Sequence, residues 1–489
     1  MGLTLALNTA RASLLANANQ IAVSARNVAG ANDPGYSRKI ATLVAGSAGG
    51  ATVTITRAGD PALYARTLAA SSDAARGDAL LSGLTKLAQT VGDTDDATAP
   101  AARLSALQAA LQAAANQPDN LQLARDAVEA AKALAGSLNQ AAGAVHAVRA
   151  EADADIGDAV ARINDLLGRF DSANRAVTRL TATGGDATDA LDDRDRILTA
   201  LSQEIGVTAV AREGGDMALY TDGGVTLFER GPRAVAFSPT AAFAAGTPGG
   251  SVTIDGVPVT GAASPMPLSS GRIAGLAALR DGVAVTYEAQ LDALAGGLIG
   301  AFAESDAVGP VGGPRAGLFT AGGNASLPAS GTAGRGGLAS SIAVNQAVDP
   351  ARGGSLALLR GGGMNGSDYA DPAAGGDAAY AGRLRGLLAS LSAAQTLDPA
   401  IGLGGAAGLP DLAASSAGWL EAQRKDASVE ASYQKTLLAR ASEALSNVAG
   451  VNGDDEAALA LQLERSYGAS AKLIGVVNDL LKTLLDAVR

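Results

Sequence analysis

The chain has 489 residues, of which 47% are hydrophobic but only 3% aromatic, so its core must be built mainly from Ala, Leu, Val and Ile. At this length we expect about two to four domains. The absence of Cys and the presence of a single His exclude disulfides and thiol chemistry, and they argue against zinc sites and His-based catalytic triads. The net charge of −11 argues against nucleic acid or an anionic membrane surface as a partner.

Apolar residues recur every seven positions at both ends of the chain. A repeat of this length predicts a narrow apolar face that one helix presents to another. An ordinary amphipathic helix on a globular core explains one such segment. Two of them, where chains normally fray, favour pairing of the ends or of subunits. This predicted assembly seam consists of Leu7, Leu14, Ile21 and Val28 at the N-terminal end, and of Leu463, Tyr467, Ile474, Val477, Leu481, Leu484 and Val488 at the C-terminal end.

Signals for a turn, a strand and several helices follow the first predicted helix. Pro34-Gly35 predicts a type II turn, because Pro sets φ at the first central position and Gly permits a positive φ at the second. Alternation over 52–56 predicts a strand. Helical spacing follows over 61–91 and 100–115, and the longest helix is expected to begin at Pro118 and Asp119.

Between residues 206 and 269 the pattern changes from helix to strand. Asp222-Gly223 and Asp255-Gly256 each lie between two short runs of alternating residues, which is a strong hairpin signal. We therefore expect a small β domain inserted into a helical body. Helix is expected again from Gly271 to about Ser305, loops with a few strands over 309–376, and mostly helix from Asp377 onward.

The sequence motifs that could support catalysis lack the neighbouring elements that their function requires. Gly361, Gly363 and Gly366 match a dinucleotide-binding spacing, but the Ser367–Pro372 segment after them opens no amphipathic helix, so a loop is expected. No Gly-Lys dipeptide occurs, which excludes a P-loop. His146, on the longest predicted helix, is expected to be a surface residue or a satisfied core residue. We predict no catalytic residue, no cofactor and no enzymatic activity.

Two acidic clusters are interpreted as structural. Asp192, Asp193 and Asp195 lie on a predicted helix with Arg194 and Arg196 among them, so a solvated or ion-paired face is favoured over a metal site. The second cluster, residues 454–456, precedes the last helix and is expected to cap it. No metal-binding residue is predicted.

Several segments resemble one protein family. The stretch from Asn27 to Arg38 resembles the signature after the N-terminal helix of flagellar rod, hook and hook-associated proteins, with Arg26 and Gly30 where that pattern has Asn, and Asp33 in place of Thr. The matching motif residues are Asn27, Pro34, Gly35, Tyr36, Ser37 and Arg38. The islands at 191–195, 271–281 and 450–471 resemble the hook-associated protein 1 (FlgK) family, whose members join the hook to the filament.

The pattern and the resemblance together predict a mainly α fold with an inserted β domain (α+β). Long paired terminal helices would form a coiled-coil-like core, beside a helical body and a small β-rich outer domain. The expected domains are residues 1–58 with 430–489 for assembly and export, 59–205 with 270–429 for the helical body, and 206–269 for the outer domain.

The resemblance implies a structural protein of the extracellular bacterial flagellum. It implies a homo-oligomeric ring between the hook protein and the second junction protein, type III export without a cleaved signal peptide, and a cytoplasmic chaperone at the C-terminal region. No membrane insertion is expected, since the best apolar run, 294–303, is too short. Two alternatives stay open: another axial protein, such as the hook protein or the second junction protein, and a secreted coiled-coil effector or adhesin.

Overall fold

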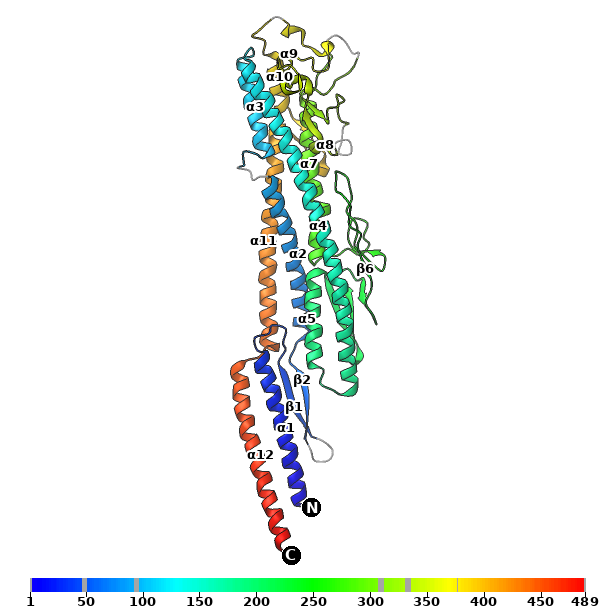
Figure 1. Cartoon of the computed structure of the whole chain (residues 1–489), viewed down its shortest axis with the longest axis vertical. Coiled ribbons are helices and arrows are strands. Elements are labelled where there is room, and N and C mark those ends of the chain that lie inside the picture. Colours follow the sequence, from blue (N-terminus) through cyan, green and yellow to red (C-terminus); the bar gives the residue numbers. More distant parts are fainter. Residues whose placement is uncertain are drawn as a thin grey trace.

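The computed structural model describes residues 2–45, 51–91, 96–306, 312–329, 336–375 and 377–487. The molecule is a long rod in which both ends of the chain lie at the same end of the rod (Figure 1). Long helices make up most of it, and the strands form small antiparallel sheets. The predicted mainly α fold with a small β insertion is therefore confirmed.

One end of the rod, which we call the terminal unit, is built from both ends of the chain. Its elements are helix α1 (Gly2–Gly30), strands β1 (Lys39–Ala45) and β2 (Ala51–Arg57), and helix α12 (Gly453–Ala487). The two strands pair antiparallel from Lys39 opposite Arg57 to Ala45 opposite Ala51 and form a ribbon. Helix α1 lies between the ribbon and α12, and it packs against both (Figure 1).

The body is a bundle of helices that run along the rod. Its helices are α2 (Pro61–Val91), α3 (Pro100–Asn116), α4 (Leu121–Thr183), α5 (Thr188–Glu204), α6 (Arg272–Ala278), α7 (Ala284–Ala301), α10 (Gly382–Ser392) and α11 (Leu409–Ala449), with a π-helical turn at Leu279–Val283 between α6 and α7. Helix α4 begins after Asn120, whose side chain accepts hydrogen bonds from the backbone N–H groups of Gln122 and Leu123. This cap places the start three residues after Pro118.

Small residues let the helices of the body approach closely. Where α2 crosses α11, a Cβ atom added to Gly77 would lie 3.2 Å from the Cα atom of Ala431. The buried face of α4 carries mainly Ala, Leu, Val and Ile, with Phe170 as its aromatic residue. At this crossing the space between the helices is therefore filled by the close approach of the two backbones and not by large side chains.

The predicted β region forms two three-stranded sheets beside the body (Figure 1). The first contains β3 (Val207–Ala211), β4 (Met217–Thr221) and β5 (Thr226–Phe228), and the second contains β6 (Val235–Ala236), β7 (Thr253–Ile254) and β8 (Val257–Pro258). At the second predicted hairpin, Asp255 and Gly256 have φ values of 49° and 83°. Two positive φ values are what a type I′ turn requires, so this hairpin is confirmed.

The far end of the rod is irregular. It holds two strand pairs and two short helices, namely β9 (Phe319–Ala321) with β10 (Ile342–Val344), β11 (Gln395–Thr396) with β12 (Ala406–Ala407), α8 (Leu338–Ser341) and α9 (Ala357–Gly361). Short 3₁₀ turns occur at Glu213–Gly215, Gln346–Val348, Pro350–Arg352, Ser367–Tyr369, Pro372–Ala374 and Pro399–Ile401. Gly363 and Gly366 lie in a loop with φ values of 86° and 112°, as expected. None of the described helices is both long and apolar enough to cross a bilayer.

Candidate functional site: the terminal unit and its junction with the body

Small and polar side chains hold α1 against α12. The hydroxyls of Ser13 and Ser470 lie 3.1 Å apart, and the Asn17 amide donates to the Ser466 hydroxyl at 2.9 Å. Asn17 is 5% exposed, so this contact is inside the helix pair. The two helices therefore use few of their large apolar side chains to bind each other.

Some side chains of the predicted assembly seam are buried between α1 and α12, and others are exposed to solvent. Leu463 and Val477 are buried, whereas Val28, Tyr467 and Leu484 are exposed. The half-buried members are Leu7, Leu14, Ile21, Ile474 and Leu481, and Val488 lies outside the described residues. On α1, the position that faces α12 is the companion series with Ala10, Asn17 and Ser24, and the series from Leu7 to Val28 lies beside it.

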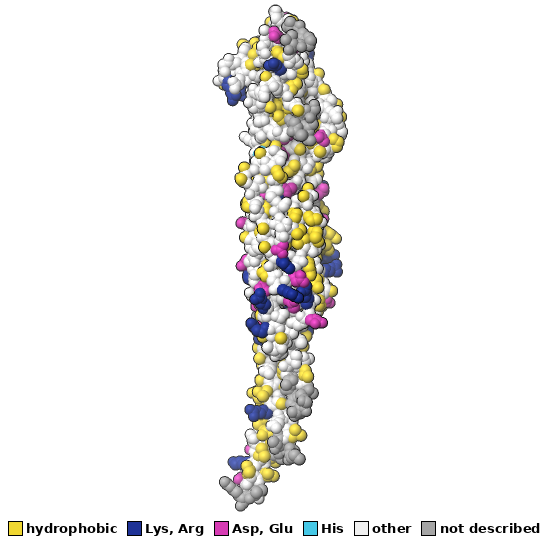
Figure 2. Space-filling view, turned by 90° about the vertical axis from the view of Figure 1, so that its right-hand side faces the viewer, with side chains coloured by type: hydrophobic (Ala, Val, Ile, Leu, Met, Phe, Trp, Pro, Cys, Tyr) yellow, Lys and Arg dark blue, Asp and Glu magenta, His cyan; other side chains and the backbone are white. Residues whose placement is uncertain are grey.

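A second set of apolar side chains on α12 was not part of the predicted seam. Leu459, Leu473, Val476 and Leu480 are 41%, 52%, 58% and 53% exposed, and we call them the α12 strip. Leu459, Leu473 and Leu480 also follow the seven-residue spacing, so the repeat could have indicated them as well. Figure 2 views this end of the rod from the side of the ribbon, where it carries hydrophobic side chains and few charges, below a band rich in charged side chains.

Asn27 is the centre of the polar contacts between α1, the ribbon and α12. Its Nδ2 donates to the backbone carbonyl of Lys39 and to Oε1 of Glu456, both at 2.9 Å. Its Oδ1 accepts from the Lys39 backbone N–H at 2.8 Å and from the Tyr36 hydroxyl at 3.0 Å. Asn27 is 1% exposed, so all of these bonds are shielded from water. One amide thus fixes three segments of the terminal unit.

The turn after α1 differs from the prediction. Gly35 is not among the described residues with a positive φ, so the predicted type II turn is wrong. The Asp33 carboxylate accepts the Gly35 N–H at 2.8 Å, and the Asp33 carbonyl accepts the Tyr36 N–H at 3.0 Å. The Arg196 side chain packs closely on this glycine, since a Cβ atom at Gly35 would lie 2.6 Å from Nε of Arg196.

Gly30 also makes room for a neighbouring side chain. A Cβ atom on Gly30 would lie 2.5 Å from the Tyr36 ring, so this ring rests directly on the end of α1. The Lys39 ammonium lies 4.0 Å from the centre of the same ring. Burial raises the pKa of the Tyr36 hydroxyl, against the opposing effect of Lys39, so it stays protonated and can donate to Asn27.

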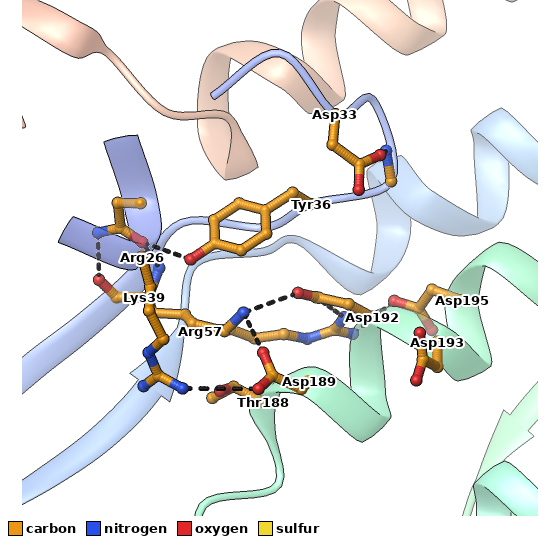
Figure 3. Close-up of polar contacts among 12 residues, drawn as sticks. Arg26, Asp33, Tyr36, Lys39, Arg57, Thr188, Asp189, Asp192, Asp193 and Asp195 are labelled. Atoms are coloured by element: carbon orange, nitrogen blue, oxygen red, sulfur yellow. Dashed lines mark hydrogen bonds and ion pairs between the residues drawn. The ribbon is translucent and has the colours of Figure 1, made fainter. Parts of the chain in front are cut away.

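Buried ion pairs join the base of the ribbon to α5 (Figure 3). Asp192, which is 1% exposed, lies 3.2 Å from both Lys39 Nζ and an Arg57 nitrogen. Lys39 also reaches Asp189 at 2.5 Å, and Arg57 reaches Asp195 at 2.6 Å. Burial lowers the pKa of Lys39, but its bonds to Asp189 and Asp192 outweigh burial, and the net shift is upward.

The ion-paired interpretation of this acidic cluster is confirmed, but its cations are not all those predicted. Lys39 and Arg57, from the ribbon, neutralise Asp192 and Asp195. Arg196 pairs with Asp193, as expected. Arg194 instead donates to the Asn174 side chain and the Gly215 carbonyl. Local sequence could not show this, because the partners are about 140 positions away.

Two more side chains extend the junction. Arg26 pairs with Asp186 at 3.0 Å and with Asp189 at 3.5 Å, so α1 itself contacts the start of α5. Glu456 was expected to cap α12, but it is 4% exposed and accepts from Ser24 and Asn27. The cap is Asn452, whose side chain accepts the Asp454 N–H. We call the whole set the polar junction: Ser24, Arg26, Asn27, Tyr36, Lys39, Arg57, Asp186, Asp189, Asp192, Asp195 and Glu456.

The chemistry of this site is that of a structural contact. The carboxylates at the centre of the junction, Asp192, Asp195 and Glu456, are each paired with a cation or an amide. Among the residues that the structure describes, no group of three or more His, Asp or Glu side chains is placed to hold a metal ion. His146 lies elsewhere, on α4, with Nε2 2.6 Å from the Glu288 carboxylate, which makes it a satisfied residue of the body.

Comparison with known proteins identifies the body. A family model described as the flagellar hook-associated protein FlgK helical domain matches residues 84–311. Residues 84–311 form a FlgK-type helical domain. The family resemblance predicted from the sequence is thereby confirmed, and the matched range contains the islands at 191–195 and 271–281. The islands at 27–38 and 450–471 lie outside it.

Individual relatives match shorter parts of the chain. The flagellar hook-associated protein 1 of Salmonella typhimurium and that of Salmonella typhi are each 33% identical to it over 76 residues. That match spans 15% of this chain and 14% of each relative. The flagellar hook junction protein FlgK from Burkholderia pseudomallei aligns with a TM-score of 0.43 and 22% identity, over 53% of this chain and 46% of that one.

Proposed function

We propose that this chain is a structural subunit of the bacterial flagellum that assembles at the junction between hook and filament. The FlgK-type helical domain supports the flagellar assignment. The observation that carries the assembly role is the terminal unit, in which the α12 strip and part of the predicted seam stay exposed although α1 and α12 are already paired. Exposed apolar side chains that are neighbours on a helix, as Leu473, Val476 and Leu480 are on α12, are characteristic of a protein interface.

The physical driving force is the burial of this surface between copies. Fully burying a Leu or Val side chain contributes roughly 1.5–3 kcal/mol, and the members of the α12 strip are about half exposed. Each strip residue therefore has about 1 kcal/mol still to gain from a partner. In a ring every subunit gains this contribution, so a weak contact per copy becomes a stable assembly.

The remaining parts of the proposal are supported by the resemblance to the FlgK family. The ring would be extracellular, with the hook protein on one side and the second junction protein on the other. The chain would leave the cell through the flagellar type III apparatus without a cleaved signal peptide, accompanied until then by a cytoplasmic chaperone at its C-terminal region. Its role would be structural and not catalytic. The hook protein or second junction protein itself, and a secreted effector or adhesin, are the competing assignments.

Deletion of the gene tests the flagellar role. We expect cells with hooks but without filaments in electron micrographs, and restoration of filaments by the intact gene. Normal filaments on the deletion strain would contradict the proposal. Cells that lack hooks as well would favour the hook protein assignment.

A double variant tests the assembly surface. Leu473→Asp with Leu480→Asp places two carboxylates in the α12 strip, and we expect filaments to be lost while the thermal midpoint of the purified monomer is unchanged. The matched control is Ala471→Asp with Lys482→Asp, on the exposed side of α12 opposite the strip, which should still support filaments. Filaments on cells carrying the strip variant would show that this surface is not an interface.

A further inference from the structure

The ribbon has one face on α1 and one face toward solvent. Its inner face includes Ala41, Val53 and Ile55, which are half-buried, and the Gln20 side chain on α1 donates to the Ala41 carbonyl. Directly paired residues of an antiparallel ribbon lie on the same face. The outer face therefore includes Ile40 opposite Thr56, Thr42 opposite Thr54, and Val44.

The outer face is exposed and carries no charge. Ile40 and Val44 are 37% and 49% exposed, and Thr42, Thr54 and Thr56 are exposed as well. The charged residues of the two strands, Lys39 and Arg57, are at the base and point to the acidic side chains of α5. Proteins commonly protect exposed ribbons from association with charges or Pro. A ribbon without that protection is typical of a surface that another molecule covers.

We propose that the outer face of the ribbon binds the α12 strip of a neighbouring copy of this chain. In one copy, α1 lies between the ribbon and α12, so the ribbon and the α12 strip cannot meet within that copy (Figure 1). A second copy placed beside the first can supply the strip, since both surfaces are apolar, uncharged and at the same end of the rod. A contact between two different surfaces repeats from copy to copy and generates a ring or a helix.

This inference rests on the proposed function, because it names the partner of the same assembly surface. Its test is Ile40→Lys with Val44→Lys in cells that lack the chromosomal gene. We expect loss of filaments with an unchanged thermal midpoint of the monomer, because both side chains are exposed. The matched control is Val210→Lys with Val257→Lys, two exposed strand valines of the β insertion, which should support filaments.

The two proposals fail in distinguishable ways. Filaments with the ribbon variant, but none with the α12 strip variant, would overturn the ribbon contact and leave the proposed function standing. Filaments with both variants would overturn both. Loss of filaments with the ribbon variant and also with the β-insertion control would contradict the specific role of the ribbon.

Cysteine cross-linking tests the geometry directly, since the chain has no native Cys. Isolated hooks from cells with Thr42→Cys and Leu473→Cys in one chain should yield a ladder of disulfide-linked oligomers after oxidation. The control pairs Thr42→Cys with Lys482→Cys, which is exposed on the side of α12 opposite the strip, and should yield monomers. Equal ladders, or ladders in neither sample from hooks that bear filaments, would refute the contact.

Discussion

Replacing Asn27 by Ala should loosen the terminal unit while leaving the body folded. The substitution removes four hydrogen bonds from a side chain that is 1% exposed. The backbone N–H and carbonyl of Lys39 lose these partners in a buried setting, and Glu456 loses one of its donors. Each buried polar group left without a partner costs about 1–3 kcal/mol. We expect a loss of about 3 kcal/mol, because relaxation and water recover part of the sum.

Hydrogen exchange followed by mass spectrometry measures this effect segment by segment. A loss of about 3 kcal/mol corresponds to roughly 100-fold faster exchange in the ribbon and the first turns of α12. Exchange in α4 should not change. The control is Asn19→Ala, the same substitution at an exposed position of the same helix, which should have no such effect. Acceleration of less than about threefold in the ribbon would refute the central role of Asn27, as would an equal acceleration in α4.

Three further predictions concern the junction and the body. Asp192→Asn should destabilise the terminal unit by about 3 kcal/mol, because it leaves Asp189 as the carboxylate partner of the buried Lys39. High salt should not restore the lost stability. A change in unfolding free energy under about 1 kcal/mol in chemical denaturation would contradict this prediction. Gly30→Ala should lower the thermal midpoint in the wild type but not in a Tyr36→Ala background, where the ring it displaces is gone. Burial raises the pKa of Asp292 to about 6, above its value of about 3.9 in the unfolded chain. As the pH falls, the folded state is therefore protonated at Asp292 before the unfolded state is, and the protein becomes more stable. Between pH 7.5 and 5 the wild type should therefore gain about 1 kcal/mol relative to Asp292→Asn, as measured by urea titration; parallel pH profiles would contradict the assignment.

Local features of the fold were predictable from the sequence. Helix α2 occupies the predicted range 61–91, and the Asp255-Gly256 hairpin forms, because periodicity and turn residues act over a few neighbouring positions. The prediction of a type II turn at Pro34-Gly35 was wrong. Gly35 packs against the side chain of Arg196, which is distant in sequence. The polar junction was missed for the same reason. Lys39 and Asp192 are more than 150 positions apart, and a single sequence carries no signal that joins them.

The seven-residue repeat illustrates a different limit. It correctly indicated helices with partners at both ends of the chain, but several positions on one helix shared the spacing. Leu463 and Val477 face α1, while Leu473 and Leu480 are exposed, although both pairs fit a repeat of seven. Periodicity alone does not say which of two partners a given face will meet. Tertiary packing decides it, by burying Leu463 and Val477 and leaving Leu473 and Leu480 exposed.

The connection between the terminal unit and the body has a mechanical consequence. The backbone crosses from one to the other at residues 58–60 and 450–452. These crossings are tied together at Arg38, whose N–H donates to the Ala449 carbonyl and whose carbonyl accepts the Ala58 N–H, both at 2.7 Å. Tension along the rod is therefore shared by two linked backbone segments. The ion pairs between the ribbon and α5 lie on one side of this connection. Tilting the terminal unit away from α5 would break these ion pairs, whereas tilting it toward α5 would not. The rod therefore bends more easily in one direction than in the other.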